Sequence, residues 1–203
     1  MTQPVVSIIN SDRPKKWQEM LSDLITDPKE LVKVLQLDPK QQPPSLAAIA
    51  QFPLKVPRHF VAAMKPGNWQ DPLLLQVWPS IQEEQSISDY VTDPLQEAEF
   101  NPVPGLLHKY QGRVLLTAVP HCAIHCRYCF RRHFDYDENT PSRAQWQQAL
   151  DYIAQDKSIE EVILSGGDPL AASDRHLKWL IDQLEAIPHL TSLRIHSRLP
   201  IVL

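Results

Sequence analysis

Stretches of strand length alternate with helical patterns in the second half of the chain. Residues 113–119, 161–165 and 192–196 have strand length, and the first two are almost continuously apolar, as in strands covered on both faces of a parallel sheet. In residues 142–153 and 173–184, apolar positions recur at helical spacing. This alternation predicts parallel strands with helices outside, and in such folds the catalytic groups lie at the carboxyl ends of the strands.

A run of short amphipathic helices is predicted for the N-terminal part. The first helix follows Arg13 and is expected to carry Leu24 and Ile25 on its buried stripe. The second begins at Asp27–Pro28 and the third at Ser45, because Asp and Ser are preferred helix N-caps and Pro suits the first turn.

Three segments follow from these patterns. Further short helices are predicted around Pro57 and after Asp71–Pro72, so residues 1–80 are expected to form a helical domain. Residues 81–112 lack strong periodicity and are predicted to be an irregular connector. Residues 113–203 are predicted to form the α/β part of the fold.

The composition is that of an ordinary soluble globular protein, with 43% hydrophobic and 22% charged residues among 203. A formal net charge of −4 gives no general attraction to nucleic acid or to anionic membranes. No apolar run has the length of a membrane span, and the N-terminus lacks the features of a signal peptide. We therefore expect a cytoplasmic protein with neither a membrane nor a nucleic acid as its direct partner.

The three cysteines of the chain, Cys122, Cys126 and Cys129, lie within eight positions directly after the strand predicted at 113–119. Their odd number and a reducing compartment argue against disulfides. Three thiolates could hold an iron–sulfur cluster with one iron left open for chemistry. A structural zinc site would instead need a fourth ligand, which one of three neighbouring histidines could supply: His121, His125 or His133.

Charged and glycine-rich residues accompany the cysteines. The nearby arginines Arg127, Arg131 and Arg132 are expected to lower the pKa of the thiols and could bind an anion. The segments Gly166–Asp168 and His196–Arg198 each follow a predicted strand, so both should meet the cysteine loop at one edge of the sheet. There, the glycines would let backbone approach a ligand closely. The Asp168 carboxylate would accept hydrogen bonds from a cationic amine or cap a turn.

Four motifs carry a resemblance to a known family. The C-x3-C-x2-C spacing with Tyr128 before the last cysteine resembles the signature of radical S-adenosylmethionine (SAM) enzymes. In order, HKYQGRVLL, CAIHCRYCFRRHF, LSGGDPL and LRIHSRLPIV resemble the lysine 2,3-aminomutase branch. Within that branch they are most similar to the bacterial aminomutases that form β-lysine for the modification of elongation factor P.

The resemblance implies a fold and a cofactor site. The fold would be a partial parallel (βα) barrel of the radical SAM type, truncated after about three strands and preceded by the small helical domain. The three cysteines would hold a [4Fe-4S] cluster whose open iron binds SAM. The amino group of SAM would be contacted by one segment of the chain: Ser165, Gly166, Gly167 and Asp168.

A second cofactor and the substrate are also implied. Tyr110 and Arg113 would hold the phosphate of pyridoxal 5′-phosphate (PLP), and Arg131 would bind the substrate carboxylate. The lysine that anchors PLP is expected beyond Leu203, where we predict that the chain is truncated. We therefore expect no covalent PLP adduct with these 203 residues alone.

The implied function is the conversion of L-lysine into β-lysine by an isomerase that needs a reductant for its cluster. Elongation factor P is its expected downstream target, and a homo-oligomer is left open. One alternative keeps the radical chemistry but acts on another amino acid, such as glutamate. Another, from a different class, is a cysteine-rich zinc module for interaction with other molecules.

Overall fold

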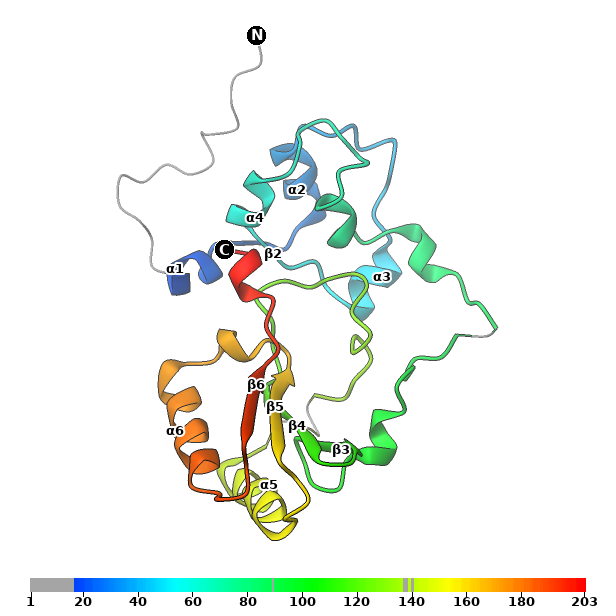
Figure 1. The fold of residues 1–203 in the computed structure, drawn as a ribbon. Helices are drawn as coiled ribbons and strands as arrows, with labels where there is room; N and C mark the ends of the chain where they lie inside the picture. The colour runs from blue at the N-terminus through cyan, green and yellow to red at the C-terminus, as the bar shows by residue number, and fades with distance from the viewer. Residues whose placement is uncertain (1–16, 89, 137–138, 140) are drawn as a thin grey trace. The chain divides into compact units, whose positions relative to one another are not determined.

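The computed structural model describes residues 17–88, 90–136, 139 and 141–203 (Figure 1). The chain divides into two compact units. Unit 1 contains the described residues up to Tyr90 together with Ala123–Arg132 and Pro200–Leu203, and unit 2 contains Val91–Cys122 and the described residues from His133 to Leu199. The segment that carries Cys126 and Cys129 therefore packs with the N-terminal helices, although it follows a strand of unit 2 in the sequence.

Unit 2 is built on a four-stranded sheet (Figure 1). Its strands are β3 (Leu106–Tyr110), β4 (Arg113–Val119), β5 (Glu161–Gly166) and β6 (Ser192–Ile195). They lie in that order, and β4, β5 and β6 run parallel, which confirms the three parallel strands predicted from the sequence. In the described residues this sheet is open and not closed into a barrel.

Strand β3 lies in the segment that we predicted to be an irregular connector. It pairs antiparallel with β4, with Leu107 opposite Leu115. The two strands are joined through Gly112, whose φ of +78° is a conformation that glycine adopts at little cost. The sequence pattern hid β3 because Leu106 and Leu107 are both buried, so the strand lacks the alternation of a one-sided edge strand.

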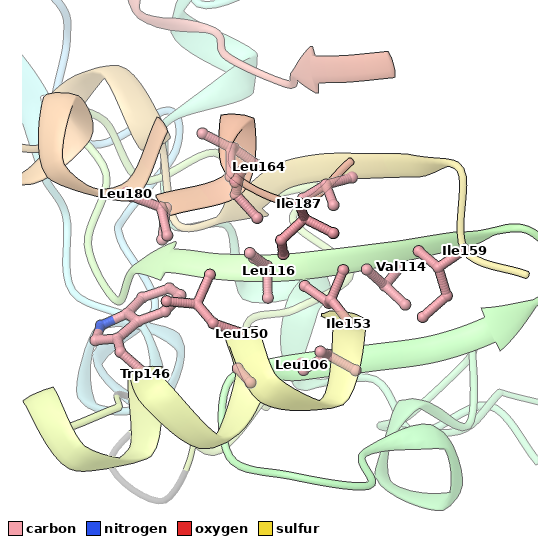
Figure 2. Close-up of a cluster of buried hydrophobic side chains, with 14 residues drawn as sticks. Leu106, Val114, Leu116, Trp146, Leu150, Ile153, Ile159, Leu164, Leu180 and Ile187 are labelled. Carbon is pink, nitrogen blue, oxygen red and sulfur yellow. The ribbon is translucent and has the colours of Figure 1, made fainter. Parts of the chain in front are cut away.

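Two helices of unit 2 pack on its sheet: α5 (Arg143–Gln155) and α6 (Asp174–Glu185). Helix α5 begins with a capping box between Ser142 and Gln145, so its N-terminal amides are satisfied locally. Figure 2 shows Leu150 and Ile153 of α5 pointing toward Leu116 of β4. The buried face of α5 is the one predicted from helical spacing: Trp146, Ala149, Leu150 and Ile153.

Unit 1 consists of short elements: α1 (Trp17–Ser22), β1 (Leu24–Ile25), α2 (Pro28–Val34), α3 (Leu46–Gln51), β2 (Val56–Pro57) and α4 (Arg58–Ala62). The prediction that Leu24 and Ile25 continue the first helix was wrong, because they pair antiparallel with β2. This pairing buries Ile25 and Val56 completely. Burial against a partner that is distant in sequence outweighs the helical spacing of two residues.

The predicted helix starts are confirmed where a polar side chain caps the first turn. The Asp27 carboxylate accepts from the Lys29 amide at 2.9 Å, and the Ser45 hydroxyl accepts from the Ala48 amide at 2.8 Å. Asp71 accepts from the amides of Leu73 and Leu74, but a short 3-10 helix follows instead of an α-helix. The 3-10 helices among the described residues are η2 (Leu74–Gln76), η3 (Ile81–Glu84), η4 (Glu97–Phe100), η5 (Pro169–Ala171) and η6 (Leu199–Ile201).

The described part of the chain contains no helix that is both long enough and apolar enough to span a membrane.

Candidate cofactor site

The cysteine segment is fixed to unit 1 by backbone hydrogen bonds. The amide of His125 donates to the Lys55 carbonyl at 2.9 Å, and the amide of Arg127 donates to the Gln76 carbonyl at 2.8 Å. Within the segment, the amide of Cys129 donates to the Cys126 carbonyl at 2.9 Å. This turn sets the spacing of two cysteines, while the two outer bonds hold their backbone against unit 1.

His125 is held by its own side chain as well. Its ring stacks on Phe52 with centroids 4.5 Å apart, and its Nδ1 lies 2.9 Å from the Pro53 carbonyl oxygen. Burial lowers the pKa of His125, and the charges of Lys55 and Arg127 lower it further against the opposing hydrogen bond to Pro53. The imidazole is therefore kept neutral, with Nδ1 as the donor to that carbonyl.

Arg127, which lies between two of the cysteines, is clamped by unit 1. Its Nε donates to Glu83 Oε1 at 2.9 Å and its Nη2 donates to Glu83 Oε2 at 2.6 Å, which is a bidentate ion pair. The same guanidinium donates to the carbonyls of Phe52 and Ala48 at 2.5 and 3.2 Å. Four acceptors leave this side chain one orientation, so the cysteine turn is anchored at its centre.

Glu83 joins a second arginine to this clamp. Arg132 Nη1 donates to Glu83 Oε2 at 2.6 Å, and the Ser80 amide donates to Oε1 at 3.0 Å. Burial raises the pKa of the Glu83 carboxyl, but hydrogen bonds from Arg127 and Arg132 and the charge of Arg127 lower it by more. The pKa of Glu83 thus lies below its ordinary value, and the carboxylate stays charged at neutral pH.

The arginines lower the pKa of the Cys129 thiol as expected, but burial outweighs their effect. Burial raises the pKa of the Cys129 thiol, and the nearby Cys126 adds to this. The backbone hydrogen bond from Arg131 and the charges of Arg131 and Arg132 lower it, but by less. A metal ion or cluster that displaces the thiol proton is the partner that would make Cys129 a thiolate.

In unit 2, the turn after β5 is built around Asp168, which is 5% exposed. Its Oδ2 accepts from the amides of Arg198 and Leu199, both at 2.8 Å. Its Oδ1 accepts from the Ser197 hydroxyl at 2.6 Å and from the Leu170 amide at 3.1 Å. The carboxylate therefore caps η5 and ties it to the segment after β6, as the alternative sequence interpretation expected.

The glycines of this turn are required by backbone contacts. A Cβ at Gly167 would lie 2.3 Å from the carbonyl oxygen of His121, and the Asp168 amide donates to that same oxygen at 2.9 Å. Gly166 has a φ of +98° and leaves no space for a Cβ beside Thr117. The segment directly after β4 and the turn after β5 are thus in direct backbone contact at His121. That the cysteines themselves meet this turn stays a prediction.

Tyr136 is a residue that the sequence interpretation missed. Its hydroxyl donates to the Gly166 carbonyl at 2.9 Å, and its ring packs edge-on against Phe134 with centroids 5.0 Å apart. No spacing rule could have indicated this contact, because the partner carbonyl lies 30 residues away. In the sequence, the aromatic residues Phe134 and Tyr136 after the cysteine segment were the available indication of a packed side chain there.

Comparisons with known proteins agree with this arrangement. The sequence profile of the Radical SAM superfamily matches residues 116–200. The L-lysine 2,3-aminomutase of Haemophilus influenzae is 52% identical over 189 residues, which cover 93% of this chain and 56% of the relative. Those of Escherichia coli and Buchnera aphidicola are 48% and 40% identical, each over 196 residues, or 96% of this chain and 57% and 58% of the relatives.

The chain is therefore similar to these L-lysine 2,3-aminomutases over 93–96% of its own length. It spans 56–58% of the length of these three relatives. The region that matches the Radical SAM superfamily runs from β4 to the segment after β6, so it contains the cysteines and the Asp168 turn.

The chemistry of the donor set fits an iron–sulfur cluster. None of the three cysteines forms a disulfide, and each is partly exposed. Cys122 belongs to unit 2, while Cys126 and Cys129 belong to unit 1. No group of three metal-ligating side chains is assembled among the described residues, so the joint ligation of a cluster stays a prediction.

The residues predicted to bind the PLP phosphate lie elsewhere on the sheet. Tyr110 pairs with Arg113 across the β3–β4 hairpin, and the Arg113 guanidinium lies 5.6 Å from the centroid of the Tyr110 ring. Arg113 also lies 4.0 Å from Glu161 Oε2. Strand β4 separates this hairpin from the cysteine end by ~20 Å at ~3.3 Å per residue. A role for this pair in binding PLP stays a prediction.

Arg131, predicted to bind the substrate carboxylate, is buried with 8% of its surface exposed. Its guanidinium carbon lies 4.9 Å from the centroid of the neighbouring Phe130 ring. It is therefore not a solvated surface charge, which was the alternative for this arginine, and its role in substrate binding stays a prediction.

Proposed function

We propose that the protein is a radical SAM, PLP-dependent aminomutase that converts L-lysine into β-lysine. One observation carries the proposal. The region that matches the Radical SAM superfamily holds the three cysteines directly after a parallel strand and the glycine turn after the next, in a chain 52% identical to an L-lysine 2,3-aminomutase.

In this proposal Cys122, Cys126 and Cys129 hold the [4Fe-4S] cluster, and the segment from Ser165 to Asp168 binds the amino group of SAM. When bound, the cluster and SAM supply an organic radical, and PLP carries the migrating nitrogen. The chain supplies placement and excludes water. Four donors already occupy the Asp168 carboxylate, so Asp168 itself is poorly placed to accept from a cationic amine as well.

The remaining roles rest on the family resemblance. Arg131 binds the carboxylate of the substrate, for which its guanidinium fork is suited. Tyr110 and Arg113 bind the PLP phosphate, and a reductant delivers the electron to the cluster. The β-lysine product serves to modify elongation factor P, a proposal supported by the likeness to the Escherichia coli and Haemophilus influenzae aminomutases.

Anaerobic reconstitution of the protein with iron and sulfide tests the cluster. We expect about four irons and four sulfides per chain, and an EPR signal of the reduced cluster that changes when SAM is added. Replacement of Cys126 by Ala should abolish both. Bound zinc without a cluster would favour the zinc module and contradict the proposal.

Product analysis tests the substrate. The protein as it occurs in the cell should convert L-lysine into β-lysine when supplied with SAM, PLP and a reductant. Conversion of L-glutamate in place of L-lysine would identify the alternative substrate. Mass analysis of elongation factor P from cells with and without the protein then tests the destination of the product.

A further inference from the structure

Two guanidinium groups share the Glu83 carboxylate in unit 1. Arg127 uses the edge formed by Nε and Nη2 for a bidentate pair with Glu83. Arg132 reaches the same carboxylate through Nη1 alone, at 2.6 Å. Within this group of three contacting side chains, two positive charges face one negative charge, so one positive charge is left uncompensated.

The other edge of Arg132 carries two donors without acceptors. Its Nε and Nη2 are buried and have no hydrogen-bond partner in the part of the chain that the structure describes. The side chain is only 14% exposed. Leaving buried charged donors unsatisfied is unfavourable, so an edge of this kind indicates a missing anionic partner.

Contacts with neighbouring residues fix the orientation of this Nε–Nη2 edge. The backbone amide of Arg132 donates to the Cys129 carbonyl at 3.3 Å, and its guanidinium carbon lies 5.4 Å from the centroid of the Phe52 ring. Together with the bond to Glu83, these contacts fix the plane of the guanidinium. A preorganised donor pair loses little conformational freedom when it binds a ligand.

We propose that the Nε–Nη2 edge of Arg132 binds the α-carboxylate of an amino-acid group. Two parallel N–H donors match the two oxygens of a carboxylate, as the Arg127–Glu83 pair demonstrates beside it. The single surplus positive charge matches one carboxylate better than a doubly charged phosphate.

The inference rests on the proposed function, which offers two sources of this carboxylate: the methionyl part of SAM and the substrate L-lysine. It adds a second carboxylate-binding arginine to Arg131. If Arg131 binds the substrate, the carboxylate at Arg132 is that of SAM.

Binding to the anaerobically reconstituted protein tests the inference and its source. Titration calorimetry would compare wild type, Arg132→Lys and Arg132→Gln with SAM in one arm, and with L-lysine and L-lysinamide in the other. Loss of two charge-assisted bonds should weaken the carboxylate ligand roughly tenfold to hundredfold, while L-lysinamide, which lacks a carboxylate, should bind the variants and the wild type alike.

Arg58→Lys is the matched control, because Arg58 of unit 1 also pairs with carboxylates, those of Asp23 and Glu30, but belongs to no cysteine segment. It should leave both affinities unchanged. A weakened SAM arm assigns the carboxylate to SAM, and a weakened L-lysine arm assigns it to the substrate. If both Arg132 variants reconstitute and bind every ligand as the wild type does, the inference is wrong.

Failure of the proposed function would look different, since the wild type would then assemble no cluster and bind no SAM. If Arg132→Gln assembles no cluster but Arg132→Lys does, the affinities of Arg132→Lys for SAM and L-lysine test the inference. If neither variant reconstitutes, Arg132 is a structural residue and the inference is overturned.

Discussion

Replacement of Gly167 by Ala tests whether the glycine turn exists for backbone packing. The added Cβ would lie 2.3 Å from the carbonyl oxygen, 2.6 Å from the carbonyl carbon and 2.7 Å from the amide nitrogen of His121. These atoms belong to backbone and cannot turn away as a flexible side chain would. Ordinary contact therefore requires the loops after β4 and β5 to separate by about 1 Å.

The cost follows from the contacts that such a separation breaks. The Gly167 amide donates to the Val119 carbonyl at 2.8 Å, and the Asp168 amide donates to the His121 carbonyl at 2.9 Å. Overpacking costs about 1–3 kcal/mol. Two buried hydrogen bonds add about 1 kcal/mol each. The free energy of unfolding should fall by about 3–5 kcal/mol, a large share of the stability of a domain.

Urea unfolding followed by circular dichroism measures this loss, and hydrogen exchange of peptides from β4 and β5 localises it to unit 2. Gly112→Ala is the control in the same unit. Gly112 has a φ of +78°, but its added Cβ would meet only the Ser158 carbonyl oxygen at 3.7 Å, an ordinary contact. It should cost only the left-handed backbone conformation, about 1–2 kcal/mol.

The comparison of the stability losses of the two variants tests whether close backbone packing requires Gly167. If Gly167→Ala loses less stability than Gly112→Ala, the close approach to His121 does not constrain the turn. If it is as stable as the wild type but binds SAM poorly, Gly167 instead makes room for the ligand, as the sequence interpretation proposed.

The remaining predictions concern three other contacts. Glu83→Gln should lower the free energy of unfolding by about 3 kcal/mol at neutral pH, because it removes the partner of two buried cations. The pKa of Glu83 in the folded protein is below its ordinary 4.5, so the wild type should lose this extra stability as the pH falls from about 4.5 through the folded-state pKa. The stability of Glu83→Gln should not fall in this way. Equal pH profiles of stability would contradict a stabilising ion pair between Glu83 and the two arginines. Asp168→Asn should cost about 2–4 kcal/mol and speed exchange of the Arg198 and Leu199 amides, since an amide nitrogen cannot accept from them; unchanged exchange would argue against the cap. Tyr136→Phe should cost about 1 kcal/mol through loss of its bond to Gly166, measured by urea unfolding, and an unchanged midpoint would show that this bond contributes nothing.

Most elements of unit 2 could be predicted from local sequence patterns. The buried face of α5 and the positions of β4 and β5 were predicted from the pattern of apolar residues, because each element buries a characteristic set of positions. The caps at Asp27 and Ser45 were equally local, since donor and acceptor lie two or three residues apart.

Contacts between distant residues escaped this reasoning. Pairing of β1 with β2 and the Tyr136 bond to Gly166 each depend on a partner about 30 residues away along the chain. The β3 strand pairs locally with β4 and was missed because it lacks alternation. The sequence offered a glycine pair, but only the fold revealed that Gly167 faces the backbone of His121.

The sequence by itself determined the chemistry available to this protein: three thiols at a fixed spacing, a glycine turn after a buried strand, and arginines beside the cysteines. Only the tertiary structure decided how these groups are used. It joined Arg127 to Glu83 across 44 residues and left one edge of Arg132 without an acceptor among the residues that the structure describes. The physical reason is that side-chain charge and spacing are local properties, whereas burial and hydrogen-bond satisfaction depend on which distant segment folds against them.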